Sequence, residues 1–250
     1  MELRFSTWQE VERYLETSKT IVLPIGSTEQ HGPNGLIGTD ALCPEALALE
    51  LGKETGALIA PTISVGMAQH HLGFPGSITL RPSTLIQVIL DMVNSLVQHG
   101  FERFYFLNGH GGNIATVSAA FSEIYAQSSL GTQAAEPPKV RCLLRNWWEA
   151  DGVMKLSREL FGEADGSHAT CGEVSLTQYA YPESIKSAEM NPPIAPTGPI
   201  YDAADYRRRF PDGRIGSNPS LANPDAGKAL FEMALRGIVL DYTRFSSVKS

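Results

Sequence analysis

Three short stretches of the sequence carry carboxylate and imidazole side chains in patterns that could bind metal ions. The first stretch follows an apolar run at residues 21–23 and contains Glu29, His31 and Asp40. Its glycines and prolines exclude regular structure, so we expect a loop at the carboxyl end of a short buried strand. Glu29 and His31 are two positions apart and point the same way in an extended segment. This ligand set suits zinc, manganese or iron, and the alternative is a polar surface loop with an incidental histidine.

The second stretch follows another apolar run, at residues 104–107, and reads Asn-Gly-His-Gly-Gly-Asn over residues 108–113. A helical pattern begins directly after it, which places His110 at the carboxyl end of a strand, where open α/β sheets bind their ligands. The glycines let the backbone approach a metal or an anion closely. A phosphate cradle is the competing interpretation, but the Walker lysine and the G-x-G-x-x-G spacing are missing.

The third stretch, His168-Ala-Thr-Cys-Gly-Glu173, adds another imidazole and another carboxylate before a further helical segment. Each stretch is a weak signal alone. Three ligand-bearing stretches from separate strand ends favour one shared metal site over three unrelated chance occurrences of such residues.

The three stretches, in this order, resemble the motifs of the creatininase (creatinine amidohydrolase) family. The residues that carry the resemblance are Gly-Ser-Thr-Glu-Gln-His-Gly-Pro at 26–33, Gly-Thr-Asp at 38–40, Asn-Gly-His-Gly-Gly-Asn at 108–113, the pair His168 and Glu173, and Phe-Pro-Gly-Ser at 74–77. The resemblance implies a three-layer α/β/α fold with a mostly parallel central sheet. It also implies a hydrolase that uses two divalent metal ions to open amide bonds of small cyclic compounds. Deformylases and peptide-trimming enzymes belong to the same family, so membership does not fix the substrate.

The resemblance further implies which residues hold each metal ion. Asp40 matches the family's bridging aspartate. Glu29 and His110 match ligands of one metal ion, and His31 matches a ligand of the other. A water molecule shared by two such ions loses a proton readily, and the resulting hydroxide can attack the substrate carbonyl. Zinc is the expected metal, with manganese and iron as alternatives.

One departure from the family pattern concerns the second metal ion. Creatininases have a glutamate two residues after the histidine of the second motif, where this chain has Gly112. Glu173 matches a glutamate of the third motif and is expected to complete the second metal site. His168 is the expected proton donor to the departing nitrogen, since the ordinary histidine pKa of ~6.5 suits acid–base chemistry. Because this chain lacks the family glutamate at Gly112, a catalytically silent metal- or ligand-binding protein on the same fold is the alternative interpretation.

Three residues are expected to contact a small-molecule amide substrate: His71, Asn113 and Trp148. Trp148 corresponds to a family tryptophan beside the substrate, with core packing as the alternative. His71 lies on a connection over residues 61–81, and a connection of this length in a compact domain is expected to have a functional role. Creatininases have another tryptophan four residues before the third-motif histidine, where this chain has Ala164. A related amide hydrolase is therefore as good a candidate as an enzyme acting on creatinine.

Alternating strands and helices are needed to position these stretches, and the apolar periodicity predicts them. Strands are expected at residues 21–23, 57–60, 104–107 and 139–144, and helices at 7–15, at 44–55, from a Ser83 cap to Gly100, after residue 113 and at 225–242. This alternation favours a parallel sheet covered on both faces. Residues 181–224 are rich in Pro, Asn and Gly and are expected to be extended. Without an internal repeat, the chain 1–250 is expected to be a single domain.

Composition excludes several classes of protein. Apolar residues at 42% and charged residues at 19% are ordinary for a globular protein, and the net charge of −7 argues against nucleic acid as a partner. The basic triplet Arg207–Arg209 is interpreted as a solvated or subunit-contact segment. Three cysteines without a C-x-x-C pair indicate a reducing compartment, and no apolar run reaches membrane-spanning length. We expect a cytoplasmic protein with no membrane partner, assembled as the homohexamer that the family resemblance suggests.

Overall fold

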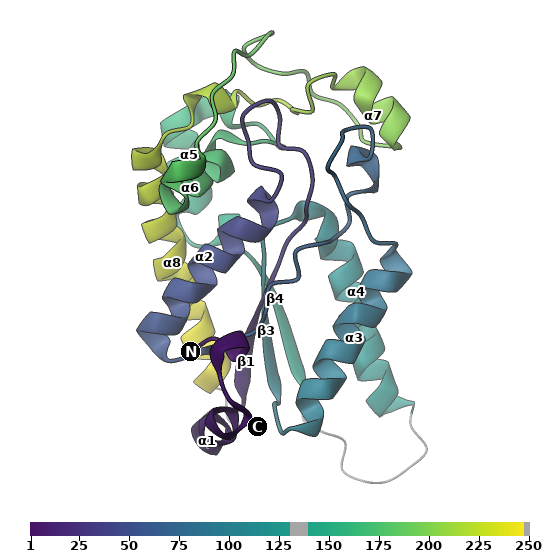
Figure 1. Cartoon of the computed structure of the whole chain (residues 1–250), viewed down its shortest axis with the longest axis vertical. Coiled ribbons are helices and arrows are strands. Elements are labelled where there is room, and N and C mark those ends of the chain that lie inside the picture. The colour runs from purple at the N-terminus through teal and green to yellow at the C-terminus, as the bar shows by residue number, and fades with distance from the viewer. Residues whose placement is uncertain (131–139, 248–250) are drawn as a thin grey trace.

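The central element of the fold is a four-stranded parallel sheet. The computed structural model describes residues 1–130 and 140–247, and its strands are β1 (Thr20–Ile25), β2 (Leu58–Ile59), β3 (Arg103–Asn108) and β4 (Arg141–Asn146). Their order is β2-β1-β3-β4, and each neighbouring pair is parallel. The strands therefore end at the same edge of the sheet, toward the upper half of Figure 1. The predicted start of the fourth strand at Lys139 lies outside the described residues.

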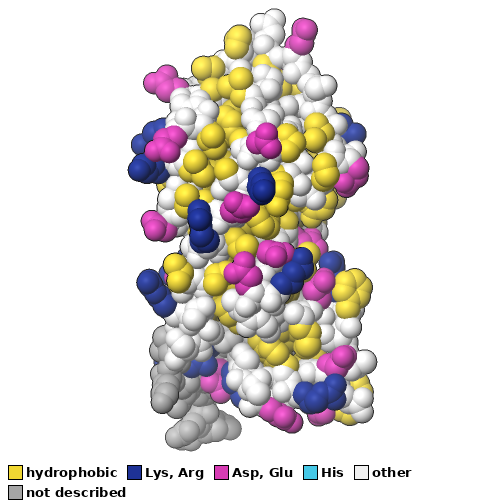
Figure 2. Space-filling view, turned by 90° about the vertical axis from the view of Figure 1, so that its left-hand side faces the viewer, with side chains coloured by type: hydrophobic (Ala, Val, Ile, Leu, Met, Phe, Trp, Pro, Cys, Tyr) yellow, Lys and Arg dark blue, Asp and Glu magenta, His cyan; other side chains and the backbone are white. Residues whose placement is uncertain are grey.

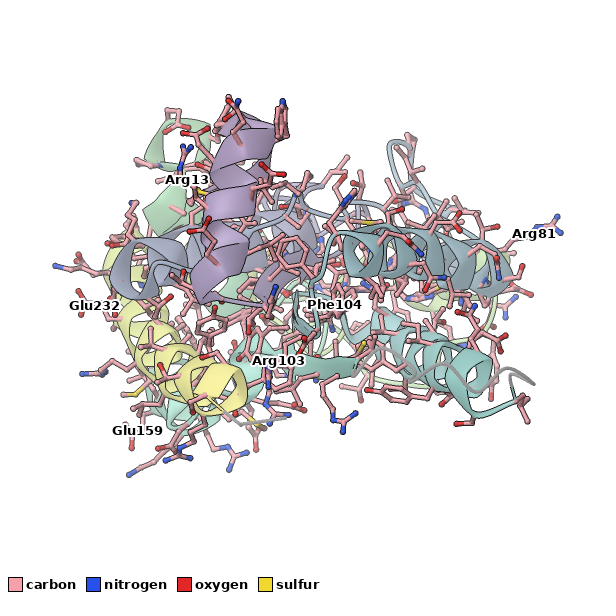
Figure 3. The ribbon with its side chains drawn as sticks, turned by 90° about the horizontal axis from the view of Figure 1, so that it is seen from below. Arg13, Arg81, Arg103, Phe104, Glu159 and Glu232 are labelled. Carbon is pink, nitrogen blue, oxygen red and sulfur yellow. The ribbon has the colours of Figure 1, made fainter. Side chains whose placement is uncertain are left out.

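Helices cover both faces of this sheet, so the predicted three-layer α/β/α fold is confirmed. The helices are α1 (Trp8–Thr17), α2 (Thr39–Thr55), α3 (Pro82–Gln98), α4 (Ile114–Ser129), α5 (Val153–Phe161), α6 (Cys171–Ala180), α7 (Ala203–Arg209) and α8 (Pro224–Ser247). α2 and α8 cover one face, and the side of the molecule that they form carries interspersed acidic and basic side chains (Figure 2). α3 and α4 cover the other face (Figure 3). None of these described helices is long and apolar enough to cross a membrane.

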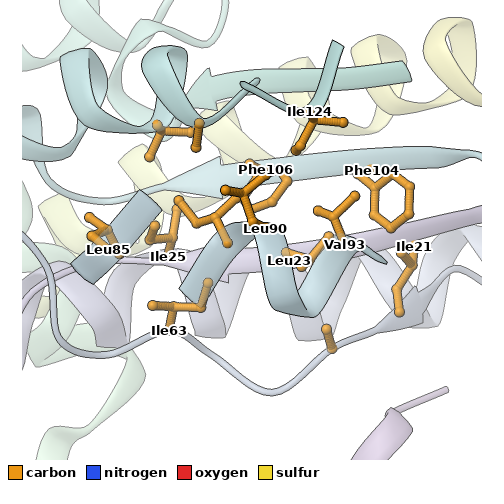
Figure 4. Packing of buried hydrophobic residues seen from close by; sticks show 14 of the residues in the cluster. Ile21, Leu23, Ile25, Ile63, Leu85, Leu90, Val93, Phe104, Phe106 and Ile124 are labelled. Carbon is orange, nitrogen blue, oxygen red and sulfur yellow. The ribbon is translucent and has the colours of Figure 1, made fainter. Parts of the chain in front are cut away.

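The alternation of side chains along β1 divides the core into two clusters. Ile21, Leu23 and Ile25 point toward α3 and α4, where they pack with the phenylalanines of β3 (Figure 4). Val22 points to the other side and packs with Tyr105 against α2 and α8. Each fully buried aliphatic side chain contributes roughly 1.5–3 kcal/mol. A slip of β1 by one residue would exchange the two faces, so the core fixes the register that positions the following loop.

α2 begins earlier than predicted. The helix starts at Thr39 with Pro44 inside it, so Asp40 lies in the first helical turn and not in the preceding loop. Pro44 has no N–H to donate to the carbonyl of Asp40, and the ends of β1 and β3 approach that carbonyl. A Cβ atom at Gly26 or Gly109 would lie 2.1 or 1.9 Å from the Asp40 carbonyl oxygen. The two glycines therefore allow the start of α2 to rest directly on the edge of the sheet.

Two helices were not predicted from the sequence, α5 and α7. α7 lies inside the segment that was expected to be extended, so that expectation is wrong for residues 203–209. Tyr206 and Phe210 are buried with Phe74 and Ile215 in a small separate cluster, and α7 lies at the top of the molecule (Figure 1). The three consecutive arginines of α7 are exposed. They interrupt the apolar periodicity, so the sequence pattern did not predict a helix here.

Candidate metal centre

The carboxyl edge of the sheet brings together the five predicted ligand residues. Glu29 and His31 follow β1, Asp40 begins α2, His110 follows β3, and Glu173 lies in the first turn of α6. The first four are buried and Glu173 is half-buried. Ligand atoms of Glu29, Asp40 and His110 all lie within 4.8 Å of one another, and so do those of His31, Asp40 and Glu173.

Asp40 belongs to both of these groups and directs one oxygen toward each, whereas a third possible group, Glu29, His31 and His168, does not include it. Its Oδ1 lies 3.0 Å from His31 Nε2, and its Oδ2 lies 2.9 Å from His110 Nδ1. His110 Nε2 lies 3.3 Å from Glu29 Oε2, and His31 Nε2 lies 3.9 Å from Glu173 Oε1. A carboxylate between two such groups has the arrangement of a bridging ligand.

Three buried carboxylate oxygens of the centre lack an aligned hydrogen-bond donor among the described residues. They are both side-chain oxygens of Glu29 and Oδ2 of Asp40. Imidazole nitrogens lie close to them, at 2.9–3.3 Å, without the alignment of a hydrogen bond. Buried polar atoms are normally paired, so such orphaned oxygens indicate a missing partner. The residues present therefore fit divalent cations.

Backbone carbonyls orient the two candidate imidazole ligands. His31 Nδ1 lies 3.0 Å from the carbonyl oxygen of Glu29, and His110 Nε2 lies 2.9 Å from that of Met67. Because a carbonyl only accepts, each of these nitrogens carries a proton. The other nitrogen of each ring, His31 Nε2 and His110 Nδ1, faces Asp40 with a free lone pair when the ring is neutral. This is the usual way in which a protein orients a metal-binding histidine.

The electrostatics of the centre favour positive charge. Burial lowers the pKa of His31, but the surrounding carboxylates, first Asp40, outweigh it and raise the pKa to about 10. Burial also lowers the pKa of His110, but the charges of Glu29 and then Asp40 outweigh it and raise the pKa to about 9. The two imidazoles outweigh burial and hold the pKa of Asp40 below its ordinary range. Burial and the charge of Asp40 raise the pKa of Glu173 to about 7, despite the opposing charge of His31. Protons therefore supply, in the metal-free protein, the charge that cations would bring.

Gly112 cannot be replaced by a carboxylate in this backbone. A Cβ atom there would lie 2.4 Å from His110 Nε2 and 2.8 Å from the carbonyl oxygen of Met67. A side chain at this position would displace His110 from the carbonyl that orients it. The second group of ligands instead obtains its carboxylate from Glu173, which approaches from α6.

His168, the expected proton donor, lies against the Glu29 side of the centre. Its Nε2 is 2.8 Å from the backbone carbonyl of Gln30, and its Nδ1 is 3.8 Å from Glu29 Oε1. Nε2 therefore carries the proton and Nδ1 has a free lone pair. Burial, together with the imidazoles of His31 and His71, holds the pKa of His168 well below its ordinary value. The ring is thus neutral and must take up a proton before it can donate one.

A cavity of about 860 Å³ opens onto the centre. His71, His168 and Trp148 line it, together with Asp40, His110 and Glu173. Trp148 is half-buried, whereas its neighbour Trp147 is buried in the core and also lines the cavity. Ala164 is buried behind the wall and presents no aromatic surface to the cavity.

Asn113 does not line this cavity, although it was expected to contact substrate. The residue is fully buried and its amide is used by the protein. Its Nδ2 donates to the carbonyl of Gly26 at 2.9 Å, and its Oδ1 accepts from the backbone N–H of Met67 at 3.0 Å. Asn113 therefore links the loops that follow β1, β2 and β3 through these hydrogen bonds.

Sequence reasoning missed two groups of residues that hold the centre. Asn108 Nδ2 donates to the carbonyl of His110 at 2.7 Å and to Asn146 Oδ1 at 2.8 Å, which fixes the turn after β3. Gln30 lies between two predicted ligands, and its side chain contacts His71 and His168. Its place inside the first motif was the only available signal, because strand alternation predicts that it points away from Glu29 and His31.

These features define a parallel α/β/α protein with a candidate metal centre, and comparisons with known proteins agree with this fold. The family model described as creatininase (creatinine amidohydrolase) matches residues 4–240. The creatinine amidohydrolase of Pseudomonas putida is 28% identical over 251 aligned residues, which cover 93% of this chain and 92% of that protein. The mycofactocin precursor peptide peptidase of Mycobacterium ulcerans (strain Agy99) is 26% identical over 228 residues, which cover 86% and 81%. A solved structure named as creatininase Mn aligns with a TM-score of 0.83 and 22% identity over 99% of both chains.

The chain belongs to the creatininase family, because the family model covers most of its length. It therefore belongs to a family of hydrolases, and its named relatives include a creatinine amidohydrolase and a mycofactocin precursor peptide peptidase.

Proposed function

We propose that this protein is a metal-dependent amidohydrolase that binds two divalent cations and cleaves a carbon–nitrogen bond of a small amide. The observation that carries the proposal is the pair of ligand groups that share Asp40. Glu29 and His110 complete one group, and His31 and Glu173 complete the other. Zinc is the proposed metal, with manganese and iron as alternatives, since imidazole and carboxylate ligands accept all three. Manganese and zinc–zinc forms exist among the similar creatininase structures.

Proton transfer is assigned to His168. Two cations held in this centre would acidify a shared water molecule and polarise the substrate carbonyl. His168 Nδ1 accepts a proton from the attacking water, because the low pKa keeps the ring neutral, and returns it to the departing nitrogen. The Gln30 carbonyl holds the opposite nitrogen during both transfers.

The cavity supports a substrate larger than creatinine. Its volume of about 860 Å³ lies within the range of ~300–1,000 Å³ that suits drug-sized ligands. Trp147 and Trp148 line the cavity, but Ala164 supplies no aromatic surface. A related cyclic amide is the proposed substrate, and the size of the cavity also favours the peptide-trimming activity that one group of relatives is named for.

Metal analysis and an amide screen on the same preparation test this proposal. We expect two metal equivalents per chain, and hydrolysis of at least one compound in a panel of cyclic amides, N-formyl compounds and short peptides. Removal of metal with a chelator should abolish hydrolysis, and Glu29→Gln should do the same. Glu54→Gln, on the exposed side of α2, is the matched control and should retain activity. Bound metal without turnover across the panel would instead support the catalytically silent alternative.

A further inference from the structure

Gln30 lies between two candidate ligands in the first motif, and its buried side chain contacts His71 and His168. Neither histidine is in the two groups that share Asp40, although His168 forms a third possible group with Glu29 and His31. We propose that Gln30 is a positioning residue that fixes the tautomers of His71 and His168 on the Glu29 side of the centre. The inference rests on the proposed metal centre, and its experiments separate the two.

Two backbone groups fix the orientation of the Gln30 amide. The N–H of Gly32 donates to Gln30 Oε1 at 2.8 Å, and Gln30 Nε2 donates to the carbonyl of Gly213 at 2.9 Å. An exchange of the amide nitrogen and oxygen would place two donors together at Gly32 and two acceptors together at Gly213. The structure therefore has one favourable orientation, in which a second N–H of Gln30 is still available.

The second N–H of Gln30 is directed to His71. Gln30 Nε2 lies 2.9 Å from His71 Nδ1 and also 2.9 Å from His168 Nε2. His168 Nε2 cannot accept, because it carries the proton that it donates to the Gln30 backbone carbonyl. The hydroxyl of Tyr206 is more distant, at 3.4 Å. His71 Nδ1 is therefore the acceptor, and a neutral His71 must carry its proton on Nε2.

This tautomer places the polar edge of His71 beside a candidate metal ligand. His71 Nε2 lies 3.0 Å from Glu29 Oε1, and although the two atoms are not aligned for a hydrogen bond, the proton-bearing nitrogen attracts the carboxylate electrostatically. With the proton on Nδ1 instead, the lone pair of Nε2 would face Glu29 and repel it. One residue thus fixes the tautomers of two histidines. The Gln30 side chain fixes that of His71, and the Gln30 backbone carbonyl fixes that of His168. Partners that orient a metal ligand in this way typically change metal affinity by ~10–100-fold when they are removed.

The first experiment measures metal affinity. Zinc is titrated into the metal-free full-length protein against a chromophoric chelator, for the wild type, Gln30→Met and Gln69→Met. Gln69 is exposed on the turn that carries His71, so the same substitution there is the matched control. We expect a loss of roughly 10–100-fold for Gln30→Met and none for Gln69→Met. Wild-type zinc affinity in a folded Gln30→Met protein would overturn the inference.

A conservative pair at His71 tests the same link without changing Gln30. His71→Gln keeps an acceptor for Gln30 and an N–H group beside Glu29, and it should retain most of the zinc affinity that is lost in His71→Met, whose side chain is similar in size but apolar. A purely structural role would not distinguish these variants by hydrogen-bonding capacity. Equal losses in both would therefore contradict the proposal, even if Gln30→Met failed to fold.

The tautomers themselves can be observed without metal. Solid-state ¹⁵N NMR of the metal-free protein, labelled at its six histidines, separates protonated from unprotonated ring nitrogens. The signals absent from His71→Gln identify His71. We expect an unprotonated Nδ1 and a protonated Nε2 in the wild type, and loss of this single state in Gln30→Met. A protonated Nδ1 in the wild type would refute the inference, whereas failure of the wild type to bind metal would refute the proposed function alone.

Discussion

Asp40 directs a different oxygen at each ligand group, so its substitution should affect both metal ions. Asp40→Ala is expected to remove both, whereas His31→Ala should weaken mainly the one shared with Glu173. Elemental analysis after dialysis at a fixed free zinc concentration distinguishes the two outcomes. Two metal equivalents retained in the Asp40 variant would rule out bridging.

Metal binding should depend steeply on pH, because the raised pKa values mean that protons occupy the centre first. At pH 7 His31 and His110 are protonated, with pKa values of about 10 and about 9, and Glu173 is half protonated, with a pKa of about 7. Metal binding must release these protons, so affinity rises with pH and falls as the solution is acidified. Between pH 7 and pH 9 we expect each zinc association constant to rise by about one decade per pH unit, and their product by about two, because each site must lose one imidazole proton. Calorimetry in buffers of different ionisation enthalpy counts the released protons directly, and a count near zero would contradict the pKa values.

His168 should affect catalysis more than metal content. His168→Ala is expected to lose on the order of 10²–10⁴ in turnover, because an amide nitrogen leaves poorly without a proton. Its zinc content should stay near the wild-type value if the ring is not a ligand. The exposed His99 provides the control, and His99→Ala should change neither quantity. A drop in zinc affinity of ~10–100-fold with a matching loss of activity would instead assign His168 to ligand orientation.

At the level of elements, Glu173 at the start of α6 belongs both to the capping box of the helix and to the candidate metal centre. Thr170 caps α6, since its hydroxyl accepts from the N–H of Glu173 and its own N–H donates to the Glu173 carboxylate. The same capping box occurs on α1, where Thr7 pairs with Glu10 in an exposed position. Each threonine-to-alanine change should cost about 1 kcal/mol of unfolding free energy. Only Thr170→Ala should also lower zinc affinity, because only Glu173 is a candidate ligand. Denaturation curves and zinc titrations on both variants provide the comparison.

The elements show what a sequence can and cannot reveal. The apolar runs in β1 and β3 predicted both strands, because buried parallel strands are continuously apolar. The start of α2 was misplaced because Pro44 is a typical first-turn residue, and the contact that permits an earlier start comes from glycines distant in sequence. The five candidate ligands were predicted from local motifs and family resemblance. Gln30 was missed because its partners, His71, His168 and Gly213, are brought to it only by the tertiary fold.

At the level of the whole molecule, the chemistry-bearing residues gather on one side of the sheet. The loops after β1 and β3, the starts of α2 and α6, and α7 all lie in the upper half of Figure 1. The face in Figure 2 carries interspersed acidic and basic side chains. The absence of a nucleic-acid partner stays a prediction from the net charge of −7. The homohexamer and the cytoplasmic location stay predictions, which analytical ultracentrifugation and cell fractionation can test.

The separation of the candidate centre from the chain ends has a practical consequence for handling the protein. α1 and the end of α8 lie in the lower half of Figure 1, away from the cavity. A tether attached at the end of α8 should therefore hold the molecule on a bead with its cavity facing the solution. Coupling through amines would also use Lys155, which is exposed on α5 beside the cavity residues Met154 and Arg158. We expect beads loaded through the C-terminal side to keep the specific activity of the free protein, and amine-coupled beads to lose part of it unless Lys155 is changed to arginine.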